Sequence, residues 1–457
     1  MHEHIDNYTY LTQAPVHRVI ITMAIPTIIS MLVTGLYNIA DTFFVGKIDT
    51  QATAAVGVVF SLMFFVQAMG FFFGHGSGNY ISRELGAQRH GNAQRMASTG
   101  FFLSFTLGLV VLLVGEACIT PLSLWLGSTP TILPHTKQYL GISLLGTPFF
   151  TSSLTMNNQM RFQGNARLAL WGILSGAIVN VLLDPLFIFV FDMGVAGAAL
   201  ATVIGQFISF LILLRMTYLG GNIRYSWRNF TPKVALFKEI IAGGTPSLSR
   251  QGLACIAMIL LNTAASAYGD VAIAAMSIVS RCTMMVLAAV IGFGQGFQPF
   301  CGFNYGAQQY QRVKQGFWFS VKVCFIFLLL LSCAGWCFPV EIIDLFRRDA
   351  EVVAIGCEAL KWQLSVLPLL SFTIVSNMLL QTIRKPWRAN LLASARSGLF
   401  FIPLILILPR LFQLQGVEMC QAISDLLAFL ISVPVVRMTF KEMDIQTQNM
   451  HHNTTTS

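Results

Sequence analysis

Apolar and polar positions along this chain alternate on the scale of whole helices. Apolar runs of about 20 residues follow one another, separated by short polar or charged stretches. A helix of that length can cross the hydrocarbon core of a bilayer. The pattern predicts an all-α integral membrane protein with twelve transmembrane helices, near residues 19–46, 52–80, 95–116, 136–160, 168–191, 195–217, 240–267, 272–303, 315–338, 356–383, 390–410 and 416–437.

The first six predicted helices resemble the second six at a constant offset of 220 residues (26 to 246). Pro26 recurs as Pro246, and Gly86-Ala87-Gln88 recurs as Gly306-Ala307-Gln308, with no gap between them. Two repeats that enter the membrane from the same side predict two six-helix lobes related by a pseudo-twofold axis along the membrane normal. The expected parts are a cytoplasmic N-terminus (1–16), an N-lobe (17–220), a cytoplasmic linker (221–238), a C-lobe (239–438) and a disordered cytoplasmic tail (439–457).

Composition and charge agree with a membrane protein. The chain is 55% hydrophobic and 10% charged, whereas soluble domains average about 25% charged residues. With a cytoplasmic N-terminus, the inner loops hold 18 lysines and arginines and the outer loops five. This positive-inside bias predicts that both termini are cytoplasmic. The basic residues are dispersed over separate loops, so contact with membrane lipids is expected and a nucleic-acid partner is not.

Several chemical classes find no support in the sequence. There is no HExxH or GxSxG motif, so no catalytic residues, enzymatic activity or cofactor are expected. The nine cysteines show no zinc-binding spacing. The run Gly74-His75-Gly76 recurs as Gly294-Gln295-Gly296, which favours close helix packing over a nucleotide-binding loop.

Acidic residues inside apolar runs are the main candidates for function. A charged group in the bilayer costs at least about 2.5–3.5 kcal/mol and usually faces the protein interior. The first half holds Asp41 and Asp184 in its apolar runs but no intramembrane lysine or arginine, so these two acids are candidates for proton or cation binding. The second half holds Asp425 together with intramembrane bases, which favours a structural ion pair with one of Arg250, Arg281 and Arg396.

Helical rise places five polar groups of the N-lobe in the outer half of the membrane: Asp41, Tyr139, Asn180, Asp184 and Thr202. Tyr37 shares a helix face with Asp41, as Asn180 does with Asp184. Neighbouring carboxylates repel in a low-dielectric site, so one is expected to hold a proton. Alternatively, Asp41, Asn180, Asp184 and Thr202 supply the hard oxygen ligands that Na⁺ requires. In a third reading these residues face different neighbours and never meet.

These residues occur in segments that resemble the multidrug and toxic compound extrusion (MATE) family, in its bacterial MepA-like branch. The resemblance covers about residues 15–440, and the segments that carry it are Ala40-Asp41-Thr42-Phe43-Phe44-Val45-Gly46, Ser82-Arg83-Glu84-Leu85-Gly86-Ala87, Gln163-Gly164-Asn165, Asn180-x-x-x-Asp184-Pro185 and Gly194-Val195-Ala196-Gly197-Ala198-Ala199. It implies two lobes in a V shape that rock to export cationic amphipathic drugs and dyes by antiport with H⁺ or Na⁺. It also implies coupling through Asp41, Tyr139, Asn180, Asp184 and Thr202, and a bend of the first helix at Pro26.

The chain departs from sodium-exporting relatives of the NorM type in its C-lobe. The helix over 248–267 has no acid and the tenth helix offers only Glu358, so coupling is expected in the N-lobe. Met156 and Asn157, on the fourth helix below the acids, are the substrate contacts we predict. The alternative functions are a lipid-linked oligosaccharide flippase or a narrow-substrate metabolite exporter of the same superfamily. A monomer in the inner membrane of a bacterium is expected.

Overall fold

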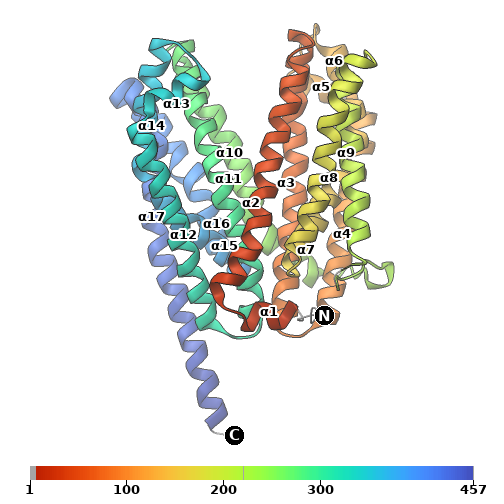
Figure 1. Ribbon diagram of the computed structural model, residues 1–457, viewed down its shortest axis with the longest axis vertical. Helices are drawn as coiled ribbons and strands as arrows, with labels where there is room; N and C mark the ends of the chain where they lie inside the picture. Colours follow the sequence, from red (N-terminus) through yellow and green to blue (C-terminus); the bar gives the residue numbers. More distant parts are fainter. Residues whose placement is uncertain (1–6, 220, 456–457) are drawn as a thin grey trace. The chain divides into compact units, whose positions relative to one another are not determined.

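The computed structural model describes residues 7–219 and 221–455, except for the side chains of residues 37–39, 41, 42, 50 and 451–455. All regular structure in this described part of the chain is helical (Figure 1). The chain forms two compact units. Ile25–Gly244 is called the N unit here, and the described residues on either side of it form the C unit.

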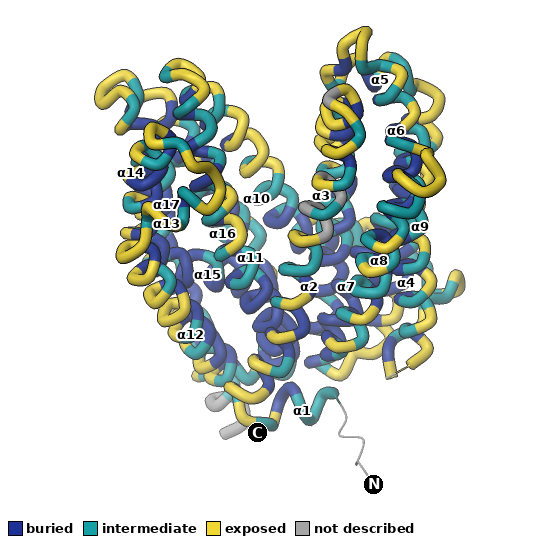
Figure 2. The backbone as a smooth tube through the Cα atoms, turned by 45° about the horizontal axis from the view of Figure 1, so that its top comes forward, coloured by how far each residue is buried: buried dark blue, intermediate teal, exposed yellow. Residues whose placement is uncertain are grey.

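The most buried helix of the N unit is α7, which lies among the other helices. Nearly all of its residues are buried, and it packs against α3, α4, α8 and α9 (Figure 2). The helices of the N unit are α2 (Val16–Val45, from Ile25 onward), α3 (Thr50–Gly86), α4 (His90–Ala117), α5 (Ile119–Trp125), α6 (Leu133–Leu145), α7 (Thr147–Phe162), α8 (Ala166–Pro185), the π-helical η1 (Leu186–Val190), α9 (Gly194–Met216) and the 3-10 turn η2 (Trp227–Asn229).

The C unit repeats this order of long helices. Its α15 takes the place of α7 and is likewise almost fully buried. The helices of the C unit are α1 (Asn7–Gln13), α10 (Val234–Ser266, from Thr245 onward), α11 (Asp270–Gly306), α12 (Tyr310–Cys337), α13 (Pro339–Phe346), α14 (Ala350–Val366), the 3-10 turn η3 (Leu367–Leu369), α15 (Leu370–Thr382), α16 (Pro386–Ser394), the π-helical η4 (Ala395–Leu399) and α17 (Phe401–Thr455).

Ten helical stretches of the described chain are long and apolar enough to cross a membrane. Two features account for the difference from the twelve spans predicted. The fourth span is broken at Gly146 into α6 and α7, because Pro148 lacks the N–H that a continuous helix needs. The last two spans are joined in α17, where Gln413 has non-helical backbone angles and separates them. The prediction of twelve helices in two lobes is confirmed by the close match to solved structures of this fold reported below.

The repeat is visible in backbone geometry. Gln88 ends the turn after α3 with a φ of 59°, and Gln308 ends the turn after α11 with a φ of 60°. Such a left-handed conformation is uncommon for a residue other than glycine, so its recurrence marks equivalent turns. Pro148 and Pro368 likewise interrupt equivalent spans, between α6 and α7 and between α14 and α15.

The glycine run of α3 is a packing surface, as predicted. A Cβ atom on Gly74 would lie 2.7 Å from Asn158 Nδ2 of α7, which is closer than real Cβ contacts allow. Gly294 of α11 meets Met378 of α15 in the same way. Small residues therefore let these helix pairs approach closely.

The first turns of α2 and α10 belong to the unit formed by the other half of the chain. Leu11 and Ala14, just before α2, accept hydrogen bonds from Asn304 Nδ2 (3.0 Å) and Arg312 Nη2 (2.8 Å) of the C unit. Glu239 of α10 forms an ion pair of 3.0 Å with Arg83 in the N unit. The unit boundaries fall between Ala24 and Ile25 and between Gly244 and Thr245, each directly before the Ile25-Pro26 or Thr245-Pro246 step.

The expectation of a disordered tail from residue 439 is wrong for the described residues, because α17 continues to Thr455. Acidic side chains of this segment pair with basic side chains elsewhere in the C unit. Glu442 pairs with Lys385 at 2.8 Å and also with Arg388, and Asp444 pairs with Lys314. The sequence showed a polar segment, but not these partners.

Candidate functional site

Three of the five predicted coupling residues meet in the N unit. Asn180 and Asp184 lie one turn apart on α8, and Thr202 lies on the neighbouring α9. Asn180 Nδ2 donates a hydrogen bond of 3.2 Å to Thr202 Oγ1 and a longer one of 3.5 Å to Asp184 Oδ1. Asp184 is 0% exposed, so its carboxyl group is fully removed from solvent. Asn180, Asp184 and Thr202 therefore lie together, and their role in coupling stays a prediction.

Two glycines bring α8 and α9 together one helical turn from Asn180 and Thr202. A Cβ atom on Gly176 would lie 2.6 Å from the carbonyl oxygen of Gly205, and a Cβ on Gly205 would lie 2.8 Å from that of Gly176. The two backbones are thus in direct contact one turn from Asn180. This contact places Thr202 within hydrogen-bonding distance of Asn180.

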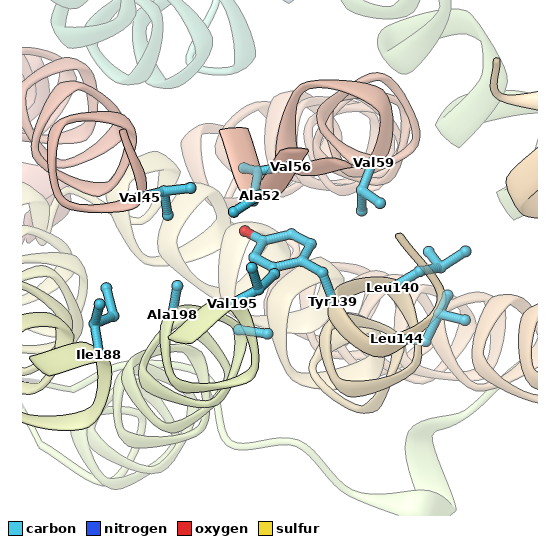
Figure 3. Packing of buried hydrophobic residues seen from close by; sticks show 11 residues of the cluster. Val45, Ala52, Val56, Val59, Tyr139, Leu140, Leu144, Ile188, Val195 and Ala198 are labelled. Carbon is cyan, nitrogen blue, oxygen red and sulfur yellow. The ribbon is translucent and has the colours of Figure 1, made fainter. Parts of the chain in front are cut away.

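Tyr139 reaches the site from α6 through an apolar cluster. Its ring lies among Val56, Val195 and Ala198, from α3 and α9, and is 6% exposed (Figure 3). Apolar packing on both faces fixes the direction of the ring. Tyr139 also lines the cavity that Asn180 and Thr202 line.

That cavity lies wholly within the N unit, with about 130 Å³ of room for the centres of water-sized molecules. Phe60, Phe64 and Phe150 give it aromatic walls. Its polar lining is neutral: Thr34, Gln67, Tyr139, Ser143, Ser153, Asn180, Thr202, Gln206 and Ser209. A concave apolar surface with a few neutral polar groups suits an amphipathic ligand.

Sequence reasoning missed part of this polar lining. Ser143 Oγ, Ser153 Oγ, Gln206 Oε1 and Asn180 Oδ1 are buried and accept or donate no hydrogen bond within the described structure. Buried polar groups are normally satisfied, so these four favour a polar ligand or water in the cavity. Ser143 follows Tyr139 by four residues and Gln206 follows Thr202 by four, so the helical period would have found both.

The remaining predicted site residues are placed as follows. The side chains of Asp41 and Tyr37 lie outside the described residues. Pro26 is buried within α2. Met156 is fully buried in a cluster with Phe101 and Phe210, and Asn157 donates a hydrogen bond of 2.7 Å to the carbonyl of Ala169. Both pack inside the N unit, and their role as substrate contacts stays a prediction.

His75 takes part in a second buried polar group, where α3 packs against the last turns of α7. Its Nδ1 lies 3.1 Å from the Phe71 carbonyl, which can only accept, so this nitrogen carries the hydrogen. Nε2 then accepts from Arg161 Nη2 at 3.3 Å, which makes the imidazole neutral. Arg161 also donates to Asn158 Oδ1 at 2.6 Å. These bonds give His75 a structural role that ties α3 to α7.

The buried acid of the C unit has the partner that the sequence suggested. Asp425 Oδ1 accepts from Arg396 Nε and from Gln421 Nε2, each at 2.8 Å. The structure thus selects Arg396 from the three candidate bases. Glu358, the other acid considered in this half, pairs with Lys361 at 3.3 Å near the surface.

No group of three or more histidine, cysteine, aspartate or glutamate side chains gathers at metal-binding distance in the described chain. The predicted Na⁺ site at Asp41, Asn180, Asp184 and Thr202 would use one carboxylate and two neutral oxygens from its described members. Such a set suits a hard monovalent cation bound weakly. The Na⁺ site stays a prediction.

The repeated six-helix unit, with a buried acid beside a cavity, defines a multi-pass membrane protein of the transporter type. The model of the MatE family matches residues 26–186 and 246–407, one match in each half of the sequence. The chain therefore belongs to the MatE family.

Similar proteins agree with this assignment over nearly the whole chain. The multidrug export protein MepA of Staphylococcus haemolyticus is 25% identical over 93% of this chain and 94% of its own length. MepA of Staphylococcus aureus is 25% identical over 96% of this chain and 98% of its own length. A solved MATE structure in a bent conformation has a TM-score of 0.91 at 23% identity, covering 97% of this chain and 99% of that one. An outward-facing multidrug resistance MATE transporter has a TM-score of 0.89 at 24% identity, and the match covers 95% of this chain and 98% of that one.

Proposed function

We propose that the protein is a secondary active multidrug exporter, which moves cationic amphipathic drugs and dyes out of the cell in exchange for H⁺ or Na⁺. The names of the similar Staphylococcus proteins, both multidrug export proteins, support drug export. The observation that carries the coupling is Asp184, a fully buried carboxyl group whose neighbours Asn180 and Thr202 line a cavity.

The proposed exchange follows from electrostatics. A deprotonated Asp184 attracts a cationic drug strongly in a low-dielectric site. Binding of a proton or Na⁺ at the carboxylate removes that attraction, so drug and ion bind in turn. A membrane potential contributes about 2.3 kcal/mol per charge for each 100 mV, which can drive export against a gradient.

The proposed coupling site consists of Asp41, Tyr139, Asn180, Asp184 and Thr202, supported by Tyr37 and by Pro26 in α2. Asp41 would supply the second carboxylate. Asn180 orients both Thr202 and Asp184 through its amide, which supports a shared role for these three. Alternating access by rocking of the two lobes, with both termini in the cytoplasm of a bacterium and the chain acting as a monomer, completes the proposal.

The test is ethidium efflux from drug-pump-deficient bacteria that express this chain, under an imposed pH gradient or Na⁺ gradient. The wild type is expected to respond to one of the two gradients, and Asp41→Asn is expected to lose the response at equal expression. Full activity of Asp41→Asn would remove this residue from the proposed site. Absence of efflux in the wild type under either gradient, with the protein in the membrane, would favour a narrow-substrate exporter or a flippase.

A further inference from the structure

Arg250 is a positive charge in the middle of α10 whose described partner is neutral. It lies 16 residues from the start of α10 (234 to 250), or about 24 Å along the helix. Arg250 Nη1 donates a hydrogen bond of 3.0 Å to Asn377 Oδ1 of α15. Within the described chain no carboxylate forms an ion pair with it, and the buried Asp425 pairs with Arg396 instead. A guanidinium has five N–H donors, so one amide oxygen leaves most of them available.

The neighbouring amide is fixed in the orientation that faces Arg250. Asn377 Nδ2 donates a hydrogen bond of 2.7 Å to the carbonyl of Ala389 on α16, so Oδ1 must point the other way. Asn377 is 4% exposed, whereas Arg250 keeps part of its surface accessible. Arg250 is thus held in place by Asn377, and as a residue it is only partly buried.

The N unit shows that the fold does not require an arginine here. Asn157, the repeat equivalent of Asn377, donates the same 2.7 Å hydrogen bond to Ala169, the equivalent of Ala389. The position equivalent to Arg250 in the N unit is Ser30, which is buried. The same tie between helices therefore forms with a serine at this place. An intramembrane arginine that packing does not need indicates a functional role.

We propose that Arg250 binds an anionic oxygen group, the carboxylate of a transported zwitterionic compound, within the C unit. This inference rests on the proposed export function and narrows its substrate class. A planar guanidinium can donate two parallel hydrogen bonds to a carboxylate, and the hydrogen bond to Asn377 fixes the orientation of the Arg250 guanidinium. Compounds that carry both a cationic amine and a carboxylate would gain affinity here, whereas a permanent cation without a carboxylate would gain none.

The experiment measures equilibrium binding of three probes to the purified full chain in nanodiscs of neutral lipid: norfloxacin, its methyl ester and ethidium. Arg250→Gln is expected to bind norfloxacin about tenfold more weakly, as the loss of a charge-assisted hydrogen bond predicts. Its binding of the ester and of ethidium should equal that of the wild type. The wild type itself should prefer norfloxacin to the ester, a result that requires no variant to fold.

Arg281→Gln is the matched control, because it removes the same charge from an exposed position on the next helix, α11. It should leave all three affinities unchanged. Equal losses for all probes in Arg250→Gln, or no preference for norfloxacin over the ester, would overturn the proposal. Loss of that preference when anionic lipid replaces neutral lipid would assign Arg250 to a lipid headgroup and overturn it as well. Absence of ethidium efflux in cells would instead contradict the export function, which these binding measurements do not depend on.

Discussion

The two units hold buried acids in opposite surroundings. In the C unit Asp425 pairs with a guanidinium and an amide, both at 2.8 Å. In the N unit Asp184 is hydrogen-bonded to the amide of Asn180 at the long distance of 3.5 Å, beside a cavity with neutral polar walls. The negative charge of a carboxylate that is paired with an arginine is already compensated, so the pair does not need a bound ion. The surroundings of Asp425 thus indicate a structural role, whereas the cavity next to the Asn180–Asp184 pair supports the ion exchange that we propose for Asp184.

The largest effect that would test this comparison is expected at Asp184. Asp184→Asn removes the negative charge but keeps the shape and one acceptor oxygen, so the protein should fold and reach the membrane. Gradient-driven ethidium efflux should be abolished. Efflux under an imposed pH or Na⁺ gradient, normalised to protein in the membrane, measures this. Wild-type efflux from the variant would show that Asp184 is not part of coupling.

The matching change in the C unit should affect stability and spare transport. Asp425→Asn leaves Arg396 without its carboxylate, and breaking a buried pair in this way costs about 3–5 kcal/mol, less here because Arg396 is a quarter exposed. The melting temperature in detergent should fall, while efflux per folded molecule stays near normal. The double variant Asp425→Asn/Arg396→Gln should recover part of the loss. A stable Asp425→Asn protein that does not transport would reverse the assignment.

A smaller effect is expected where α8 meets α9. Gly205→Ala introduces a Cβ atom 2.8 Å from the Gly176 carbonyl and 3.1 Å from Asn180 Cβ. Overpacking of this kind costs about 1–3 kcal/mol, and it should lengthen the bond from Asn180 to Thr202. Efflux should decrease but persist. Gly57→Ala on α3, where a Cβ meets no atom within 4 Å, is the control. Equal activity of the two variants would show that the close helix approach does not matter for coupling.

The smallest difference is expected between the repeat-related asparagines. Asn157→Ala and Asn377→Ala each leave a helix carbonyl without its side-chain donor, at a cost of about 1–3 kcal/mol. Asn377→Ala should destabilise more, because it also removes the acceptor for Arg250. Melting temperatures of the two variants, measured side by side, give the comparison. A larger loss in Asn157→Ala would mean that the Arg250 contact adds nothing to stability.

The sequence predicted most of the helices and part of the site, for identifiable reasons. Run length determines which segments can span a membrane, and helical rise with an i, i+4 spacing places Asn180, Asp184 and Thr202 at one depth. Depth does not give direction, however. Met156 lies at a suitable depth but points into an apolar cluster. The choice of Arg396 among three arginines likewise depended on packing that no local pattern contains.

The exchange of first turns between the units has a consequence for how such a chain is made and how it arose. While the first half leaves the ribosome, the segment at Leu11 and Ala14 has no Asn304 or Arg312 to bind, so its packing is completed only after the second half is synthesised. A separately expressed half would lack the turns that the other half supplies. Before the gene duplicated, a six-helix ancestor with this arrangement would have completed its packing by exchanging first turns with a second copy, as a domain-swapped dimer.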